Sequence, residues 1–411
     1  GIIIDHRTGL YITGTRNNMH VLRTCFYRLF RHMKILYYFA VIMTMLISCA
    51  TAQDGKKELV ADSLYHDQDS VLSHIEDYSD TIEIKYAKGL KVEYKPDGIH
   101  VTITNPDPAA KASKPQHITI RKSSSRFICT TALQLGNFEV LGLEDKIVGI
   151  NSLRHIFSLR MLDQLESGKT AEIGKEGNFD LETVMRTKPD FILVSASKYG
   201  GFEALKECGI PLIFHHGYKE TNPLGQAEWI KLVGILTGET KRANAVFADI
   251  EKKYNTLKEE VEKATSDNKK LPTVISGRQL RDGWYIVGGR SYMAQLFRDA
   301  GADYIMKDNK ESGGIALDFE SVYAKGIHAD FWQTDGSSKG NFSLKELANE
   351  DARYATMDAF KNKRVIFCDL SQTPYRELGG VQPHFLLADF VKAFHPEILP
   401  SYIPKYYKLI K

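Results

Sequence analysis

The chain has 411 residues, and its apolar (43%), aromatic (10%) and charged (26%) fractions are ordinary for a globular protein. Its length can supply two hydrophobic cores. The net charge of +3 comes from the N-terminal part: residues 1–49 hold six basic residues and one acidic residue, so the rest carries −2. A basic surface for nucleic acid is therefore not expected.

A short apolar run at residues 35–47 follows a basic stretch at 31–34. A basic stretch, a short apolar core and a small residue before a cut describe a secretory signal peptide, and the run is short for a membrane-spanning helix. We predict a signal peptide over 33–49, with an uncleaved N-terminal anchor as the alternative. Residues 1–32 begin with Gly rather than Met and are interpreted as an upstream extension outside the fold.

The signal peptide ends in Leu-Ile-Ser-Cys, which resembles a bacterial lipobox. The resemblance implies that Cys49 is the lipidated first residue of the mature protein. We therefore expect a protein of the cell envelope, lipid-anchored and either periplasmic or at the cell surface. Beyond the leader Cys129, Cys208 and Cys368 remain, an odd number that predicts buried side chains rather than a disulfide framework.

Two segments precede the main fold. Residues 50–79 are largely polar and are predicted to be a flexible tether. Residues 80–125 contain alternating apolar and polar runs, separated by turn signals at 96–98 and 105–108. This pattern predicts antiparallel hairpin strands, which would form a small β preface to the main fold.

From residue 126 onward, strand-like runs alternate with helical stretches, a pattern typical of a parallel sheet built from βα units. Residues 126–238 form the first such array. Apolar residues then recur at helical spacing over 239–267, with Lys and Glu on the other face, which predicts one helix of about 40 Å. Residues 268–411 form a second array. The predicted fold is therefore α/β, with two lobes joined by a long helix.

One motif occurs in both arrays, as DLETV from Asp180 and as DFESV from Asp318. Each aspartate is predicted to cap a helix, because its side chain can accept N–H groups of the first turn. Glu182 and Glu320 then lie where the helix dipole favours negative charge. The repeat indicates two lobes of similar plan, and a ligand is expected to bind between them.

The lipobox, the duplicated lobes and the connecting helix together resemble the class III substrate-binding proteins of ABC importers, the iron-siderophore, haem and vitamin B12 group. The strings that carry the resemblance are LGLEDKIVGI, NFDLETV, KPDFILVSAS, LKECGIPLIF, AGADYI, LDFESV and NKRVIF. It implies two Rossmann-like lobes on a rigid helix, no cofactor, no catalysis, and delivery of the ligand to an ABC permease and its ATPase. It also implies that Glu182 and Glu320 dock on the permease, whereas without it both are ordinary first-turn acids. We expect a monomer.

Ligands of open α/β sheets gather at the carboxyl ends of the strands. Loops after the predicted strands hold arginines and aromatic residues, and the resemblance places Tyr285 and the loop with Tyr375 at ligand-contacting positions. Guanidinium groups bind carboxylate or catecholate oxygens and rings cover apolar faces, which favours an anionic iron chelate, with haem or a corrinoid as alternatives. The candidate ligand-binding residues are Arg154, His155, Tyr199, Tyr218, Arg278, Arg281, Trp284, Tyr285, Tyr375 and Arg376.

Other functions have weaker support. His215 and His216 are adjacent, but no second spaced histidine pair completes a metal site, so no metal ligand is predicted. Gly-Lys-Thr at 168–170 resembles the end of a phosphate loop, but Asp163 stands where the leading glycine belongs. An envelope metal-ion binder and an enzyme on the same fold are the remaining alternatives.

Overall fold

The computed structural model describes residues 3–4, 11–12, 64–65, 71–108, 110, 114–151, 156–195, 202–266, 270–281 and 283–411. The chain divides into two compact units, residues 1–57 and 58–411. In the first unit, strands β1 (Ile3–Ile4) and β2 (Tyr11–Ile12) pair antiparallel. The predicted signal peptide and Cys49 lie outside the described residues. Among the described helices, none combines the length and hydrophobicity needed to cross a membrane.

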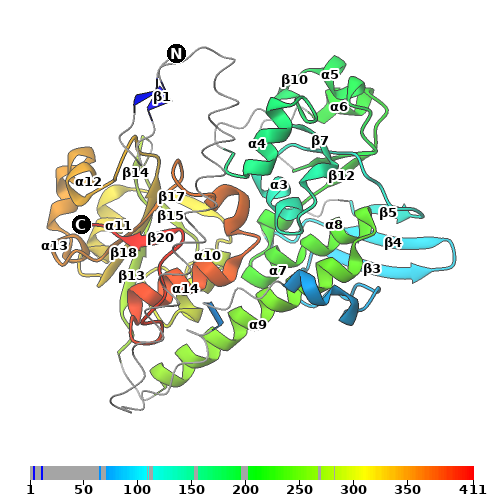
Figure 1. Cartoon of the computed structure of the whole chain (residues 1–411). Helices are drawn as coiled ribbons and strands as arrows, with labels where there is room; N and C mark the ends of the chain where they lie inside the picture. The colour runs from blue at the N-terminus through cyan, green and yellow to red at the C-terminus, as the bar shows by residue number, and fades with distance from the viewer. Residues whose placement is uncertain are drawn as a thin grey trace, which may run out of the picture. The chain divides into compact units, whose positions relative to one another are not determined.

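The second unit begins with the β preface. After the 3-10 helix η1 (Val71–Asp77), three antiparallel strands form one sheet: β3 (Leu90–Lys95), β4 (Gly98–Ile103) and β5 (Gln116–Ile120). The expected hairpin strands are present. Val101, Ile103 and Ile120 are buried, so one face of the sheet packs on the core while the other carries charged side chains. Figure 1 shows this sheet in cyan beside α8.

The first lobe is built on a five-stranded parallel sheet in the order β12-β11-β6-β7-β8. The strands are β6 (Phe127–Cys129), β7 (Ile147–Ile150), β8 (Ala171–Glu172), β11 (Phe191–Val194) and β12 (Leu212–Phe214). Its helices are α3 (Ala132–Glu139), α4 (Leu159–Glu166), α5 (Leu181–Arg186), α6 (Phe202–Glu207), α7 (Pro223–Glu228) and α8 (Ile230–Thr237). Short elements complete it: η2 (Glu144–Lys146), β9 (Gly174–Lys175), β10 (Asn178–Phe179) and η3 (Gly217–Lys219). The apolar runs are continuous because helices cover the sheet.

The second lobe has its own five-stranded sheet, ordered β16-β13-β18-β19-β20, in which only β20 is antiparallel. These strands are β13 (Thr273–Ser276), β16 (Asp303–Tyr304), β18 (Phe331–Gly336), β19 (Val365–Asp369) and β20 (Tyr407–Leu409). A smaller antiparallel sheet joins β14 (Arg278–Leu280), β15 (Gly283–Val287) and β17 (Gly314–Leu317). The helical elements are α10 (Tyr292–Asp299), α11 (Phe319–Gly326), α12 (Leu344–Glu350), η4 (Ala352–Thr356), α13 (Asp358–Lys361), η5 (Tyr375–Gly379) and α14 (Pro383–Phe394). The two lobes thus have separate sheets, which confirms the predicted two-lobed α/β fold.

Helix α9 (Thr240–Thr265) connects the lobes and packs against α8 of the first and α14 of the second. Its apolar stripe is buried as the periodicity predicts. The Tyr254 hydroxyl on this stripe donates to Asp299 of α10 at 2.7 Å, a buried hydrogen bond between the connecting helix and the second lobe.

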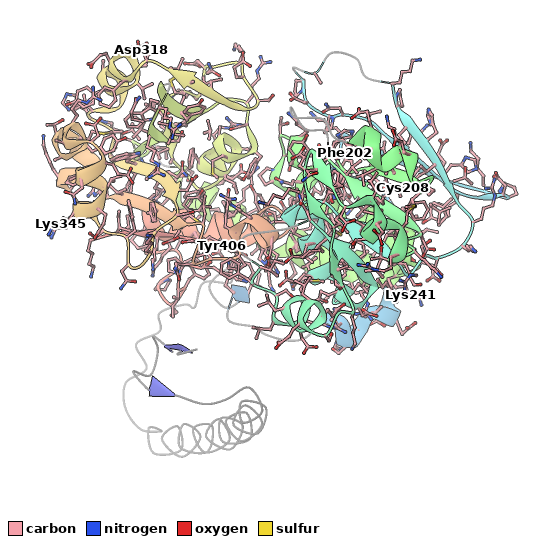
Figure 2. All side chains as sticks on the ribbon, turned by 90° about the horizontal axis from the view of Figure 1, so that it is seen from above. Phe202, Cys208, Lys241, Asp318, Lys345 and Tyr406 are labelled. Carbon is pink, nitrogen blue, oxygen red and sulfur yellow. The ribbon has the colours of Figure 1, made fainter. Side chains whose placement is uncertain are left out.

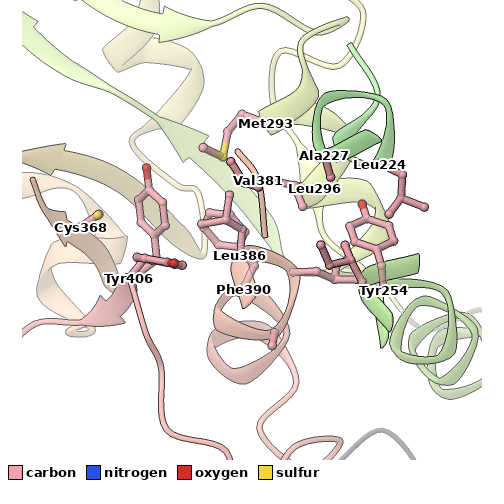
Figure 3. Packing of buried hydrophobic residues seen from close by; sticks show 14 of the residues in the cluster. Leu224, Ala227, Tyr254, Met293, Leu296, Cys368, Val381, Leu386, Phe390 and Tyr406 are labelled. Carbon is pink, nitrogen blue, oxygen red and sulfur yellow. The ribbon is translucent and has the colours of Figure 1, made fainter. Parts of the chain in front are cut away.

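The lobes also pack directly on each other. One buried apolar cluster includes Leu224 and Ala227 of α7, Leu296 of α10 and Phe390 of α14, and Figure 3 shows these side chains together with Tyr254. A second contact joins α3 to η5. A Cβ atom added at Gly136 of α3 would lie 1.8 Å from the Glu377 carbonyl oxygen, so only glycine permits this approach.

Candidate ligand-binding site

The first lobe contains a hollow of about 240 Å³ at the carboxyl ends of its strands. Three adjacent strands contribute: β6 is followed by Thr130 and Thr131, β11 by Ser195, and β12 by the turn with Tyr218. The lining residues are Thr130, Thr131, Leu133, Glu176, Phe179, Ser195, Phe202 and Tyr218. The hollow therefore has the position expected of a ligand site in an open α/β sheet.

Hydrogen bonds hold the hydroxyl groups of this hollow in place. Thr131 caps α3 and forms a capping box with Gln134. The Gln134 amide also donates to the Ser195 hydroxyl at 3.0 Å, and the Thr130 hydroxyl donates to the Leu193 carbonyl at 3.0 Å. The polar groups are thus fixed before any ligand binds.

The rim of the hollow is aromatic and acidic. Phe179 and Glu176 come from the β9–β10 hairpin, and Phe202 begins α6. Burial, and then the charges of Asp107 and Glu176, raise the pKa of Tyr218, so its phenol stays protonated at neutral pH. Of the predicted first-lobe residues Tyr218 lines the hollow, whereas Arg154, His155 and Tyr199 lie outside the described residues.

A larger hollow of about 610 Å³ lies elsewhere in the first lobe, around the Gly-Lys-Thr stretch. Arg126, Lys169 and Arg186 line it, and all three are exposed. Arg126 precedes β6 and Lys169 precedes β8, so this hollow opens at the amino ends of the strands, opposite to the usual ligand edge. We therefore place the candidate site at the smaller hollow.

The second lobe presents arginines at the corresponding edge of its sheet. Arg278 follows β13, and its Nη1 donates to both Glu350 carboxylate oxygens, at 2.9 and 3.0 Å. Arg376 follows β19 and is exposed. Between them, at the end of β18, lies Asp335: burial raises the pKa of this carboxyl, and the nearby Arg278 and Arg376 oppose the rise. Asp335 was not predicted from the sequence.

The other predicted second-lobe residues have different surroundings. Tyr285 is 40% exposed on β15, opposite Arg278, and Arg281 is exposed at the β14–β15 turn. The Tyr375 hydroxyl hydrogen-bonds that of Tyr292 at 2.8 Å, so part of its side chain is tied into the lobe.

Trp284 is a correction, because its side chain is fully buried. Its indole N–H donates to the Ser276 carbonyl at 2.9 Å, and its ring packs on Trp332 and Phe319. The prediction that Trp284 contacts a ligand was wrong. Its place on β15 alternates with that of the exposed Tyr285, so the two side chains point to opposite faces.

His215 and His216 are buried against Trp229. Burial, and then the neighbouring His216, lower the pKa of His215 to about 3, so it is neutral at physiological pH. In the part of the chain that the structure describes, no three His, Cys, Asp or Glu side chains converge in a group that could hold a metal ion.

Residues 128–371 match the family model described as periplasmic binding protein, which is more than half of the chain. The chain belongs to this family. Its members are binding components of transport systems rather than enzymes. The β preface lies before the matched residues.

Two curated relatives of this periplasmic binding protein come from Methanocaldococcus jannaschii. One, named as an uncharacterized lipoprotein, is 28% identical over 240 residues, which cover 57% of this chain and 54% of the relative. The other, an uncharacterized protein, is 24% identical over 234 residues, which cover 56% of this chain and 68% of the relative. The chain thus spans about half the length of the first relative and about two thirds of the second.

Solved structures share the two-lobed fold. A periplasmic binding protein from Veillonella parvula superposes with a TM-score of 0.55 at 14% identity, covering 73% of this chain and 99% of that one. A structure from an ABC-type Fe3+-hydroxamate transport system of Saccharomonospora viridis superposes with a TM-score of 0.54 at 15% identity, covering 68% of this chain and 96% of that one. A periplasmic heme binding protein from Pseudomonas aeruginosa superposes with a TM-score of 0.53 at 18% identity, covering 70% of this chain and 98% of that one.

The repeated motif of this periplasmic binding protein has the same local structure in both lobes. Asp180 accepts the Thr183 N–H at 3.0 Å and Asp318 accepts the Ser321 N–H at 2.8 Å, which confirms both predicted helix caps. Glu182 is exposed in the first turn of α5. The side chain of Glu320, in the first turn of α11, is 79% exposed and 3.4 Å from Arg353. Both carboxylates are accessible to a partner.

Proposed function

We propose that this protein is a lipid-anchored receptor of the cell envelope that captures a ferric siderophore-like chelate between its lobes and delivers it to an ABC permease and its ATPase. The observation that carries the proposal is that both sheets present polar side chains at the carboxyl ends of their strands. In each lobe, three adjacent strands end in polar side chains: hydroxyls in the first lobe, and Arg278, Asp335 and Arg376 in the second.

The chemistry of the two edges favours a large anionic ligand with apolar faces. Guanidinium groups pair with carboxylate, hydroxamate or catecholate oxygens, and the first-lobe rings can cover the apolar part of a chelate. The titles of the Fe3+-hydroxamate and heme-binding structures point to the same ligand classes.

Haem is the second candidate, because Phe179, Phe202 and Tyr218 line the hollow and a tyrosine can bind haem iron. The raised pKa of Tyr218 disfavours the phenolate that would bind iron, so we rank the chelate first.

The proposal is tested by calorimetric titration of the purified protein with a ferric hydroxamate, a ferric catecholate, haem and cyanocobalamin. We expect saturable one-to-one binding of a ferric chelate, and weaker binding after Arg376→Ala. The exposed Arg121, in the β preface, provides the matched control Arg121→Ala, which should leave affinity unchanged. Absence of binding to all four compounds, or turnover of one of them, would refute the proposal.

Membrane attachment is a separate part of the proposal. We propose that the mature chain begins at Cys49 and carries the lipid there, as the lipobox resemblance implies and as the name of one relative suggests. Metabolic labelling with a palmitate analogue should mark the native protein and not Cys49→Ser. Equal labelling of both proteins would contradict this part alone.

A further inference from the structure

The β preface is fixed to the first lobe by two buried carboxylates. Glu228 of α7 accepts the backbone N–H groups of Lys85, Tyr86 and Ala87 at 2.9, 2.6 and 2.8 Å. Lys231 Nζ, also buried, donates to the same carboxylate at 2.8 Å and balances its charge. The segment that leads into β3 is therefore held by charge-assisted hydrogen bonds.

Glu220 continues this attachment. It accepts the N–H groups of Lys88 and Gly89 at 3.1 and 2.9 Å, and the Trp229 indole N–H at 3.1 Å. A Cβ at Gly89 would lie 2.7 Å from the Trp229 ring, so the preface fits closely against the lobe.

The far end of the preface is attached to the edge of the first-lobe sheet. The Gln116 side-chain amide donates to the Leu212 carbonyl at 2.7 Å, and its oxygen accepts the Phe214 N–H at 2.9 Å. One side chain thus pairs with the open edge of β12 as a further strand would. The preface is thus hydrogen-bonded to the first lobe both before β3 and at β5.

Asp107 of the preface contacts the second lobe. It lies in the loop between β4 and β5, where Lys219 Nζ of the first lobe lies 3.2 Å from its Oδ2. The Ser312 hydroxyl, from the loop before β17, donates to the other oxygen of Asp107 at 2.8 Å. The Asp107 side chain is only 17% exposed, so these interactions are shielded from solvent. In Figure 2 the cyan strands of the preface run along the first lobe.

The second-lobe loop that holds Ser312 is itself hydrogen-bonded to its lobe. The residues on either side of Ser312 bond to the turn after β15: the Gly288 N–H donates to the Gly313 carbonyl at 2.8 Å, and the Arg290 N–H donates to the Glu311 carbonyl at 3.0 Å. Because each segment is hydrogen-bonded to its own lobe, the bond between Asp107 and Ser312 restricts the movement of the two lobes.

We propose that the β preface links the two lobes and fixes the distance between them beside Tyr218. In this link, which we call the brace, Asp107 binds Lys219 of the first lobe and Ser312 of the second. The family match begins at residue 128, so the preface lies outside the matched residues. A preset spacing would limit the size of ligand that the protein accepts. That consequence rests on the proposed function, whereas the brace itself does not.

Hydrogen–deuterium exchange of the ligand-free full chain tests the brace. Asp107→Ala should accelerate amide exchange in residues 306–313 of the second lobe by about ten-fold, as expected for loss of a charge-assisted hydrogen bond. Ser312→Ala, which removes one partly buried hydroxyl, should reproduce this acceleration, and the double variant should add nothing further. The control Asp97→Ala, at the exposed β3–β4 turn, should change exchange only in the preface.

The spacing itself is measured by the distance between spin labels on the exposed residues Lys206 of α6 and Lys345 of α12, in a Cys208→Ser background. Asp107→Ala and Ser312→Ala should each shift or broaden the distance distribution relative to the native protein. Unchanged distances, or acceleration confined to the preface, would overturn the brace. Because no ligand is present in either experiment, that result would leave the binding proposal standing.

Discussion

Replacing Glu139 by glutamine should stabilise the protein progressively as pH rises from about 5 to about 8. Glu139 lies on α3 of the first lobe and faces Glu377 on η5 of the second. Burial, and then the charges of Glu377 and Glu144, raise the pKa of Glu139 to about 8. Burial also raises the pKa of Glu377, whose carboxylate accepts the Phe157 N–H at 3.0 Å. The contact between the lobes therefore favours a shared proton.

The direction of this pH effect on stability follows from the protonation of Glu139 in the folded and in the unfolded chain. Below an ordinary pKa of 4.5 its carboxyl is protonated in both the folded and the unfolded chain, and the contact carries no penalty. Above that pH the unfolded chain loses the proton while the folded chain keeps it until about pH 8, so stability falls across this interval. The full difference corresponds to about 5 kcal/mol, and screening by solvent at the partly exposed Glu139 side chain reduces our expectation to about 2 kcal/mol.

Urea unfolding at several pH values checks this prediction. The midpoint for Glu139→Gln should exceed that of the native protein at pH near 8, and the difference should shrink toward pH 5. Glu259→Gln, which changes an exposed carboxylate of α9, is the matched control and should follow the native protein. A difference that does not depend on pH, or a less stable Glu139→Gln protein at high pH, would refute the reasoning.

Three further predictions concern docking and packing. Charge reversal at both Glu182 and Glu320 should leave ligand affinity intact and abolish stimulation of the importer's ATPase, and undiminished stimulation would exclude the docking role. Gly136→Ala should cost about 3 kcal/mol or more in the free energy of unfolding, because its methyl group would clash with the Glu377 backbone, and a native-like thermal midpoint would contradict this. Glu228→Gln should lose about 2–4 kcal/mol in the free energy of unfolding, because the buried Lys231 ammonium loses the carboxylate that balances its charge. It should also make the preface susceptible to limited proteolysis, and retained resistance would count against this attachment of the preface.

The sequence alone determined the features that depend on neighbouring residues. The helix caps at Asp180 and Asp318 and the apolar stripe of α9 all arise within a few residues along the chain. Caps and stripes can be predicted because a helix brings residues three and four apart together wherever it lies. The two-lobed α/β plan followed from the repetition of such local units.

Only the tertiary structure decided which side chains meet. The alternation of β15 did not show that Trp284 faces the core and Tyr285 the solvent, because that depends on which face the neighbouring elements cover. Strand β6 is three residues long and gave no clear signal, so Thr130 and Thr131 were not predicted to line the hollow. The bond between Asp107 and Ser312 joins residues 205 positions apart. Contacts of this kind are set by the packing of whole elements, and local sequence preferences do not encode them.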